Sequence, residues 1–223
     1  ENLNHSLYIR PFIFATDPYI GIKPSENYKF MIFTCPVGAY YSDPVSVKIE
    51  TNFSRAVKGG TGSAKAAGNY AAALYPAMLA AEEGFRQLIW TDAIEHKYIE
   101  EAGTMNVIFI INNVLVTPIS GDTILNGITK KSVLEIAKDW GIEIQERKIE
   151  VEEILNALKS GSLTEAFGAG TAATIAPISN ISLNGDNFII PESRSDHFHV
   201  KVLDYLSKYK RGEVQDKFNW LEV

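Results

Sequence analysis

Cysteine, excess positive charge and long apolar runs are scarce or absent in this sequence of 223 residues. Because Cys35 is the single cysteine, the chain cannot form an internal disulfide, which fits a reducing, cytoplasmic compartment. Lysine and arginine number 21 against 27 aspartate and glutamate residues, and the formal net charge of -6 argues against nucleic acid as a partner. No apolar run approaches the roughly 20 residues that a transmembrane helix needs, so we expect no membrane partner.

The remaining composition is that of an ordinary globular protein. The length allows a substantial core, and 46% of the residues are hydrophobic. Cys35 lies inside the apolar run of residues 31–37, which favours a buried small hydrophobe over a catalytic thiol. There is no initiating methionine and no signal-peptide pattern, so we expect the chain to be truncated or processed at its start.

Strand-like and helix-like segments alternate along the chain. Aromatic and β-branched residues predict strands at residues 7–15, 28–37, 45–51, 87–91, 105–111, 114–117, 142–149, 178–183 and 188–191. Helical spacing of apolar residues predicts helices at about residues 68–83, 129–140, 151–159 and 197–209. Asn112-Asn113 and Asn184-Gly185 supply two-residue hairpin turns. Because hairpins are frequent, we expect a mixed α/β sheet rather than a doubly wound one.

Residues 38–44, which read G-A-Y-Y-S-D-P, interrupt this pattern. They predict a connection between two domains. Pro11 and Pro36 lie in the two strands before it, where proline is expected at strand ends or edges.

Lys65 stands in a stretch of small residues, G-G-T-G-S-A-K-A-A-G-N-Y at 59–70. Ordering a long charged side chain there costs entropy, so such a lysine is seldom filler. One use is a Schiff base with a carbonyl, including that of pyridoxal phosphate. A P-loop is excluded because Ala64 precedes the lysine and Ala66 follows it. A flexible loop with a solvated lysine, leading into a helix, stays open as the alternative.

Three further stretches contain residues suited to cofactor binding. Residues 98–106, Y-I-E-E-A-G-T-M-N, place carboxylates before an apolar strand, where one of them could protonate a pyridine nitrogen. Residues 125–129, L-N-G-I-T, precede a helix whose free N–H groups suit a phosphate. Residues 168–173, G-A-G-T-A-A, let backbone amides approach a ligand. Their structural alternatives are a solvated acidic turn, an ordinary threonine N-cap and a tight turn or bulge.

Taken jointly, a lysine, a carboxylate and two phosphate-binding turns are the parts of a pyridoxal phosphate site. In order and spacing, K-A-A-G-N-Y, E-A-G-T-M-N, N-G-I-T and G-A-G-T-A-A resemble the branched-chain amino acid aminotransferases of the class IV (fold type IV) pyridoxal phosphate enzymes. L-Y-I-R-P at 7–11 and C-P-V-G-A-Y at 35–40 resemble them too. The resemblance implies the C-terminal part of a small α/β domain at 1–42, an interdomain connection at 43–48 and a large cofactor-binding domain at 49–223.

The resemblance also implies roles for single residues around the cofactor. Lys65 would bind it as an aldimine and, once released, move a proton between the substrate α-carbon and cofactor C4′. Tyr70 would contact the phenolic oxygen and Glu101 the pyridine nitrogen, with Glu100 a solvated neighbour. We expect Lys65 to precede the helix and Tyr70 to lie on its first turns, because five helical residues turn side chains apart. The phosphate is assigned to the amides of Ile128 and Thr129, with Thr171 and the helper Arg55.

The substrate side of the implied site draws on both domains. Thr104 and Ala172 would contact the substrate carboxylate. Near the side-chain pocket, an arginine could pair the distal carboxylate of glutamate while apolar neighbours accept leucine, isoleucine or valine. The residues matching that pocket are Tyr8, Arg10 and Tyr40, with Ile22 across a dimer interface. The implied activity is transamination between these amino acids and 2-oxoglutarate, in branched-chain amino acid biosynthesis, by a homodimer or higher homo-oligomer.

Two departures from the family pattern stand out. Ala173 and Ala176 replace the Cys-x-x-Cys pair of some relatives, so no thiol switch is expected. The resemblance also implies that the sequence begins partway through the family's amino-terminal domain, which supplies a phosphate-binding arginine and aromatic pocket residues, so we expect most of that domain to be missing here. The alternatives are a D-amino acid aminotransferase, an aminodeoxychorismate lyase or a non-catalytic module that binds a phosphate-bearing ligand. E-A-G-T-M-N and L-Y-I-R-P favour the branched-chain group, and no metal is expected.

Overall fold

The computed structural model describes residues 6–38 and 43–222. By its internal contacts the chain divides into two compact units, Glu1–Ser42 and Asp43–Val223. Tyr40, predicted to contact substrate, lies outside the described residues. None of the helices in the described ranges is long and apolar enough to cross a membrane.

The first unit is an antiparallel hairpin. Its strands β1 (Ser6–Ala15) and β2 (Tyr28–Val37) pair from Ser6 opposite Val37 to Ala15 opposite Tyr28. Pro11 lies inside β1 rather than at its end, which is tolerated because each strand of a two-stranded ladder is an edge. Within this unit Cys35 is half-buried, not buried as predicted, since a hairpin has no second layer of its own.

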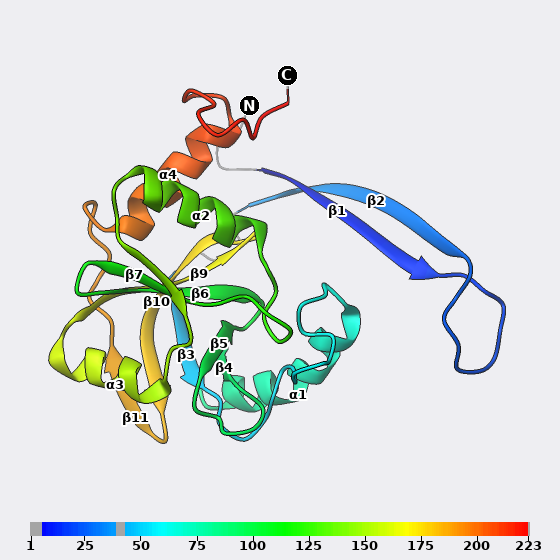
Figure 1. Cartoon of the computed structure of the whole chain (residues 1–223), viewed down its shortest axis with the longest axis horizontal. Coiled ribbons are helices and arrows are strands. Elements are labelled where there is room, and N and C mark those ends of the chain that lie inside the picture. The colour runs from blue at the N-terminus through cyan, green and yellow to red at the C-terminus, as the bar shows by residue number, and fades with distance from the viewer. Residues whose placement is uncertain (1–5, 39–42, 223) are drawn as a thin grey trace. The chain divides into compact units, whose positions relative to one another are not determined.

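The second unit is a mixed sheet with helices around it, as Figure 1 shows. The strands run in the order β11-β10-β3-β4-β5-β6-β7-β8, and β9 pairs with both β10 and β6. Parallel pairs, such as β3 with β4 and β7 with β8, occur beside antiparallel ones. The predicted mixed α/β fold is therefore confirmed. The strand bounds are β3 (Val45–Ile49), β4 (Gln87–Thr91), β5 (Ile99–Ala102), β6 (Met105–Ile111), β7 (Val114–Pro118), β8 (Ile144–Arg147), β9 (Leu163–Gly170), β10 (Thr174–Leu183) and β11 (Asp186–Ile189).

Four helices accompany this sheet: α1 (Ala67–Glu82), α2 (Ile128–Asp139), α3 (Val151–Ser160) and α4 (Phe198–Lys210). Helices α2 and α4 lie together over its central strands in Figure 1. Their apolar faces share one buried cluster with side chains of the strands, including Ile136 of α2, Val202 of α4 and Phe167 of β9. Removing such side chains from water is the main stabilisation that a core provides.

Two predicted hairpin turns form as expected. Asn112 and Asn113 have φ angles of 50° and 63°, and Asn184 and Gly185 have 52° and 90°. Positive φ at both central residues matches the twist of the flanking strands, and asparagine and glycine adopt it at low cost.

Several strands differ from the prediction. β9 continues through Gly168 to Gly170, β10 begins at Thr174 instead of residue 178, and β11 ends at Ile189 instead of residue 191. Residues 99–102, for which a solvated acidic turn was the structural alternative, form β5.

Candidate functional site

Lys65 lies immediately before α1, and Tyr70 lies in the first turn of that helix. As predicted, the lysine precedes the helix, and this arrangement brings the two side chains together: Lys65 Nζ donates to Tyr70 Oη at 2.9 Å. The loop is fixed by Asn69, whose Nδ2 donates to the carbonyls of Thr61 at 2.7 Å and Ala64 at 2.9 Å. Both members of the lysine–tyrosine pair are exposed in this chain, so ligands can reach the amine.

Glu101 lies on β5, in the middle of the sheet, and is 4% exposed. Its Oε1 accepts the N–H of Leu125 at 2.5 Å, and Arg55 Nε lies 3.5 Å from Oε2. Burial raises the pKa of the Glu101 carboxyl to about 7, while the charge of Arg55 and the Leu125 hydrogen bond oppose that rise. Such a carboxyl changes protonation near neutral pH, which is a common property of functional sites.

Glu100 is not the solvated neighbour that was predicted. Only 6% of it is exposed, because residues 99–102 form a strand inside the sheet instead of a surface turn. Thr123 Oγ1 donates to its Oε1 at 2.5 Å, and its Oε2 has no hydrogen-bond partner among the described residues. Burial raises the pKa of this carboxyl too, against the Thr123 bond and the charge of Arg55.

Arg55 connects these carboxylates to the lysine loop. Its Nη2 donates to the carbonyl of Gly62 at 3.1 Å and to that of Thr123. Gly62 has no room for a side chain, since a Cβ there would lie 2.5 Å from that of Ala56. Arg55 was expected to help hold a phosphate, but its hydrogen bonds and ion pair are with these loops and Glu101. Arg55 therefore lies beside Glu101, the residue predicted to contact the pyridine nitrogen of the cofactor, and not beside the predicted phosphate site.

The N-terminus of α2 forms another side of the site. The N-cap is Gly127, and no side chain among the described residues caps it, so the first N–H groups remain available to a ligand. A Cβ on Gly127 would stand 2.2 Å from Asn106 Oδ1. Asn106 in turn donates to the carbonyl of Leu125 at 2.8 Å and lies 3.4 Å from Glu101 Oε1. It therefore links the buried carboxylate to the loop before α2.

Lys130, the third residue of α2, anchors this end of the helix. It is 1% exposed, and its Nζ donates to the carbonyl of Pro118 and to Glu146 Oε1, each at 2.6 Å. Ser120 Oγ accepts a third bond at 3.1 Å. A buried ammonium is stable only when it is paired and hydrogen-bonded in this way.

The end of β9 completes the site. Gly168 and Gly170 face Met105 of β6, and a Cβ on them would lie 2.7 Å and 3.1 Å from that side chain. The glycines thus allow β9 to pair closely with β6. Thr171 follows directly in the turn before β10.

These parts enclose a cavity of about 190 Å³. Asn106 and Gly127, for which no role was predicted, line it as well. The one sequence feature that could have indicated them is their position in the motifs: Asn106 ends E-A-G-T-M-N, and Gly127 lies in N-G-I-T. Six of the predicted site residues line this cavity: Lys65, Glu101, Thr104, Ile128, Thr129 and Thr171.

The other described residues predicted for the site do not line this cavity. Tyr70 and Arg55 reach it through their contacts with Lys65 and Glu101. Ala172 is the exposed residue after Thr171. Tyr8, Arg10 and Ile22 belong to the first unit, where Arg10 Nη2 donates to Tyr8 Oη at 2.6 Å and Ile22 is exposed.

The family model for amino-transferase class IV matches residues 1–181. The chain belongs to this class IV aminotransferase family. Branched-chain-amino-acid aminotransferase 2 of Bacillus subtilis is 46% identical over 218 residues, which are 96% of this chain and 60% of that protein. A branched-chain-amino-acid aminotransferase of Mycobacterium tuberculosis is 40% identical over 97% of this chain and 61% of its own length.

Solved structures of class IV aminotransferases share the fold. The branched-chain aminotransferase of Thermoproteus uzoniensis, solved with norvaline, matches with a TM-score of 0.82 and 27% identity over 97% of this chain and 68% of that one. The Escherichia coli enzyme matches with a TM-score of 0.81 and 29% identity over 97% and 70%. The predicted fold type is thereby confirmed. The chain spans about 60% of the length of the curated relatives it matches.

Proposed function

We propose that the protein is a pyridoxal phosphate-dependent branched-chain amino acid aminotransferase, which transfers the amino group of leucine, isoleucine or valine to 2-oxoglutarate. The observation that carries this proposal is the cavity lined by Lys65, Glu101, Thr171 and the N-terminus of α2. An amine, a buried carboxyl and a helix N-terminus without a side-chain cap, which suits a phosphate, line this cavity in the family to which the chain belongs. The relatives' names supply the branched-chain substrates.

The residues present fit pyridoxal phosphate. Lys65 Nζ would hold the aldehyde carbon covalently, and Glu101 would pair with the ring nitrogen. The free amides of Ile128 and Thr129, together with the Thr171 hydroxyl, would hold the phosphate. Gly127 and Gly170 line this cavity without side chains. A side chain at either position would contact Asn106 or Met105 too closely. When bound, the cofactor would act as an electron sink for the substrate α-carbon.

The chain's own residues would carry out the proton transfer. Lys65 Nζ, once free, would take the proton from the substrate α-carbon and return one to the neighbouring cofactor carbon. Tyr70 Oη, 2.9 Å from that nitrogen, would orient the amine. Glu101 would hold the ring nitrogen protonated, and Arg55 beside it would favour the ionised carboxylate that this requires.

Substrate recognition is proposed for residues of both units. Thr104, exposed at the cavity, and Ala172 would contact the substrate carboxylate. Arg10 would pair with the distal carboxylate of glutamate. Tyr8 lies next to it, since the Arg10 guanidinium carbon is 5.1 Å from the centroid of the Tyr8 ring. Tyr40 and Ile22 are proposed for the same pocket.

We also propose the organisation of the complete protein. Residues 1–42 would belong to a small domain and residues 49–223 to the large cofactor-binding domain, and the division into two compact units supports a boundary after residue 42. The connection predicted at 43–48 overlaps β3, which pairs with β10 and β4 inside the sheet, so these residues belong to the larger unit. A cytoplasmic homodimer is proposed with it, because the single cysteine suits a reducing compartment and Ile22 is fully exposed within its unit.

A substrate panel tests the proposed activity on the protein in its full natural length. With 2-oxoglutarate and pyridoxal phosphate, isotope-labelled leucine should give 4-methyl-2-oxopentanoate, whereas D-alanine and aminodeoxychorismate should not react. Lys65→Ala should abolish turnover because it removes the proton-transferring amine, while Lys58→Ala, an exposed lysine of the same loop, should retain it. Turnover of D-alanine alone, or unchanged turnover in Lys65→Ala, would overturn the proposal.

A further inference from the structure

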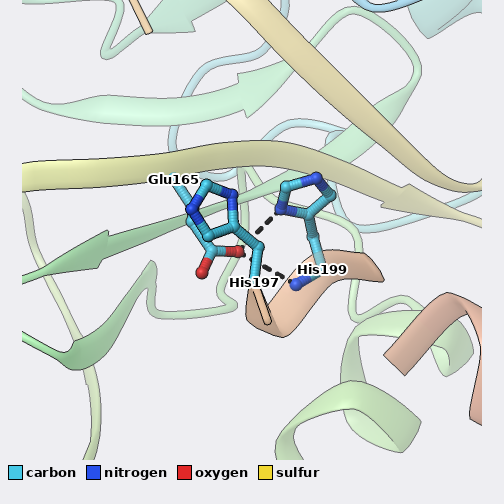
Figure 2. A group of neighbouring side chains, drawn as sticks. All are labelled: Glu165, His197 and His199. Carbon is cyan, nitrogen blue, oxygen red and sulfur yellow. Dashed lines mark hydrogen bonds and ion pairs between the residues drawn. The ribbon is translucent and has the colours of Figure 1, made fainter. Parts of the chain in front are cut away.

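Three ligand-type side chains meet at the start of α4, outside the cavity of the proposed active site. Figure 2 shows Glu165 of β9 beside His197 and His199, which flank the first residue of the helix. One ligand atom from each residue lies within 4.8 Å of the other two. All three residues are buried, with 4–6% exposure. A carboxylate and two imidazoles at such spacing are a ligand set for a metal ion.

Capping of the helix explains only part of this cluster. Glu165 Oε1 accepts the N–H of Phe198 at 2.8 Å, and Oε2 accepts the N–H of His199 at 3.0 Å. Both bonds come from the backbone, so the cap needs neither imidazole. His197 Nδ1 accepts the N–H of Arg194 at 3.3 Å, a long hydrogen bond that a metal ion on this nitrogen would replace. Among the described residues no lysine or arginine forms an ion pair with Glu165, and its ion-pair contact is with the ring of His199. Its buried charge is therefore stabilised at close range by two backbone N–H groups and by the His199 ring, with no lysine or arginine in ion-pair contact.

We propose that Glu165, His197 and His199 bind one divalent transition-metal ion of the zinc class. The ion would take the place between His199 Nδ1 and Glu165 Oε2, which now lie 2.7 Å apart and would separate slightly around it. A neutral His199 would then carry its proton on Nε2. That nitrogen lies 2.8 Å from Ser193 Oγ, which can accept the proton in a hydrogen bond. Metal-binding histidines are usually oriented by such a bond from their other nitrogen.

The surroundings suit the entry of a cation. An open cavity of about 670 Å³ is lined by Glu165 itself and by Asp196 and Asp204, with Lys201 as the basic residue of its wall. Three protein ligands leave a tetrahedral position free, and water from this cavity can fill it. The ion would join α4 to β9, the strand whose far end carries the glycines of the proposed active site.

Calorimetric titration of the metal-free chain with zinc chloride tests the proposal. We expect one equivalent to bind, and cobalt(II) to bind competitively with the visible absorption of a tetrahedral site. His197→Asn and His199→Asn should each weaken zinc binding at least ~100-fold, since losing an outer hydrogen bond alone typically costs 10–100-fold. His197→Asn should still fold, because residue 197 is the N-cap of α4 and asparagine is a preferred N-cap.

A matched control separates the cluster from nonspecific binding to histidine. His96 has a φ of 50°, which asparagine tolerates, and lies outside the cluster, so His96→Asn should bind zinc like the unmodified chain. Circular dichroism confirms that each variant is folded. The proposal is overturned if the unmodified chain binds no zinc at millimolar concentration, or if His96→Asn weakens binding as much as the folded cluster variants do.

Discussion

At the scale of single residues, opposing effects set the pKa of Glu101. Burial raises it from 4.5 to about 7, against the charge of Arg55 and the Leu125 hydrogen bond. Because the folded pKa exceeds the unfolded one, the folded state binds more protons than the unfolded state between these values. The chain therefore loses stability as the pH rises from 4.5 toward 7, by a free energy on the order of 3 kcal/mol.

Glu101→Gln removes this titration but keeps an oxygen that can accept the Leu125 N–H. The free energy of unfolding of the unmodified chain should fall, relative to that of Glu101→Gln, as the pH rises from about 4.5 to about 7, and the difference should level off above 7. Urea denaturation across this range measures it. Glu95→Gln, at an exposed residue, should follow the unmodified chain. Parallel curves for Glu101→Gln and the unmodified chain would contradict the pKa assigned to Glu101.

Some contacts of these residues could be predicted from the sequence and others could not, and the difference has physical causes. The pairing of Lys65 with Tyr70 was predictable, because a five-residue separation brings side chains together only if the lysine precedes the helix. The burial of Glu100 was not predictable, because it depends on β4 and β6, which flank β5 in the sheet. Asn106 has no local signal, since its partners lie 5 and 19 residues away along the chain.

At the scale of secondary-structure elements, the first turn of α2 depends on a glycine. Gly127 has a φ of -66°, so its backbone would accept any residue, and only the nearby Asn106 excludes a side chain. Asn106 also bonds the carbonyl of Leu125 just before the helix. Displacing Asn106 would therefore disturb both the carboxylate side and the phosphate side of the proposed site.

Gly127→Ala tests this dependence. The new Cβ would lie 2.2 Å from Asn106 Oδ1, and overpacking of this kind typically costs about 1–3 kcal/mol. We expect a loss of that size in the free energy of unfolding and weaker pyridoxal phosphate binding, measured by denaturation and absorbance titration. Gly121→Ala is the matched control, since no described atom lies within 4 Å of a Cβ there. Equal effects of the two substitutions would contradict the steric role of Gly127.

Elements with a strong local pattern were predicted closely, and those defined by distant partners were not. The bounds of β2, β4 and β6 match the prediction, since apolar β-formers bounded by turn residues mark them. Four-residue β5 contains two glutamates and shows no such pattern. Gly168 and Gly170 indicate a loop by themselves, but pairing of β9 with β6 and β10 keeps them in a strand.

At the scale of the whole molecule, the proposed chemistry divides unevenly between the two units. Lys65, Glu101, the α2 N-terminus and Thr171 all belong to Asp43–Val223, whereas Tyr8 and Arg10 belong to Glu1–Ser42. Cofactor binding should therefore depend on the larger unit, and substrate selection on both. The sequence indicated Lys65, Glu101 and Thr171 for the proposed cofactor site because each lies in a short motif. No local motif shows how the units combine.

The most direct measurement adds pyridoxal phosphate to this chain, reduces the product with borohydride and maps the labelled peptide. The account predicts one pyridoxyl group on Lys65, because its amine faces the cavity that also holds Glu101 and the free amides of α2. Lys58→Ala should be labelled at Lys65 as well. Absence of the label, or its scatter over exposed lysines, would contradict the claim that residues 43–223 assemble the cofactor site.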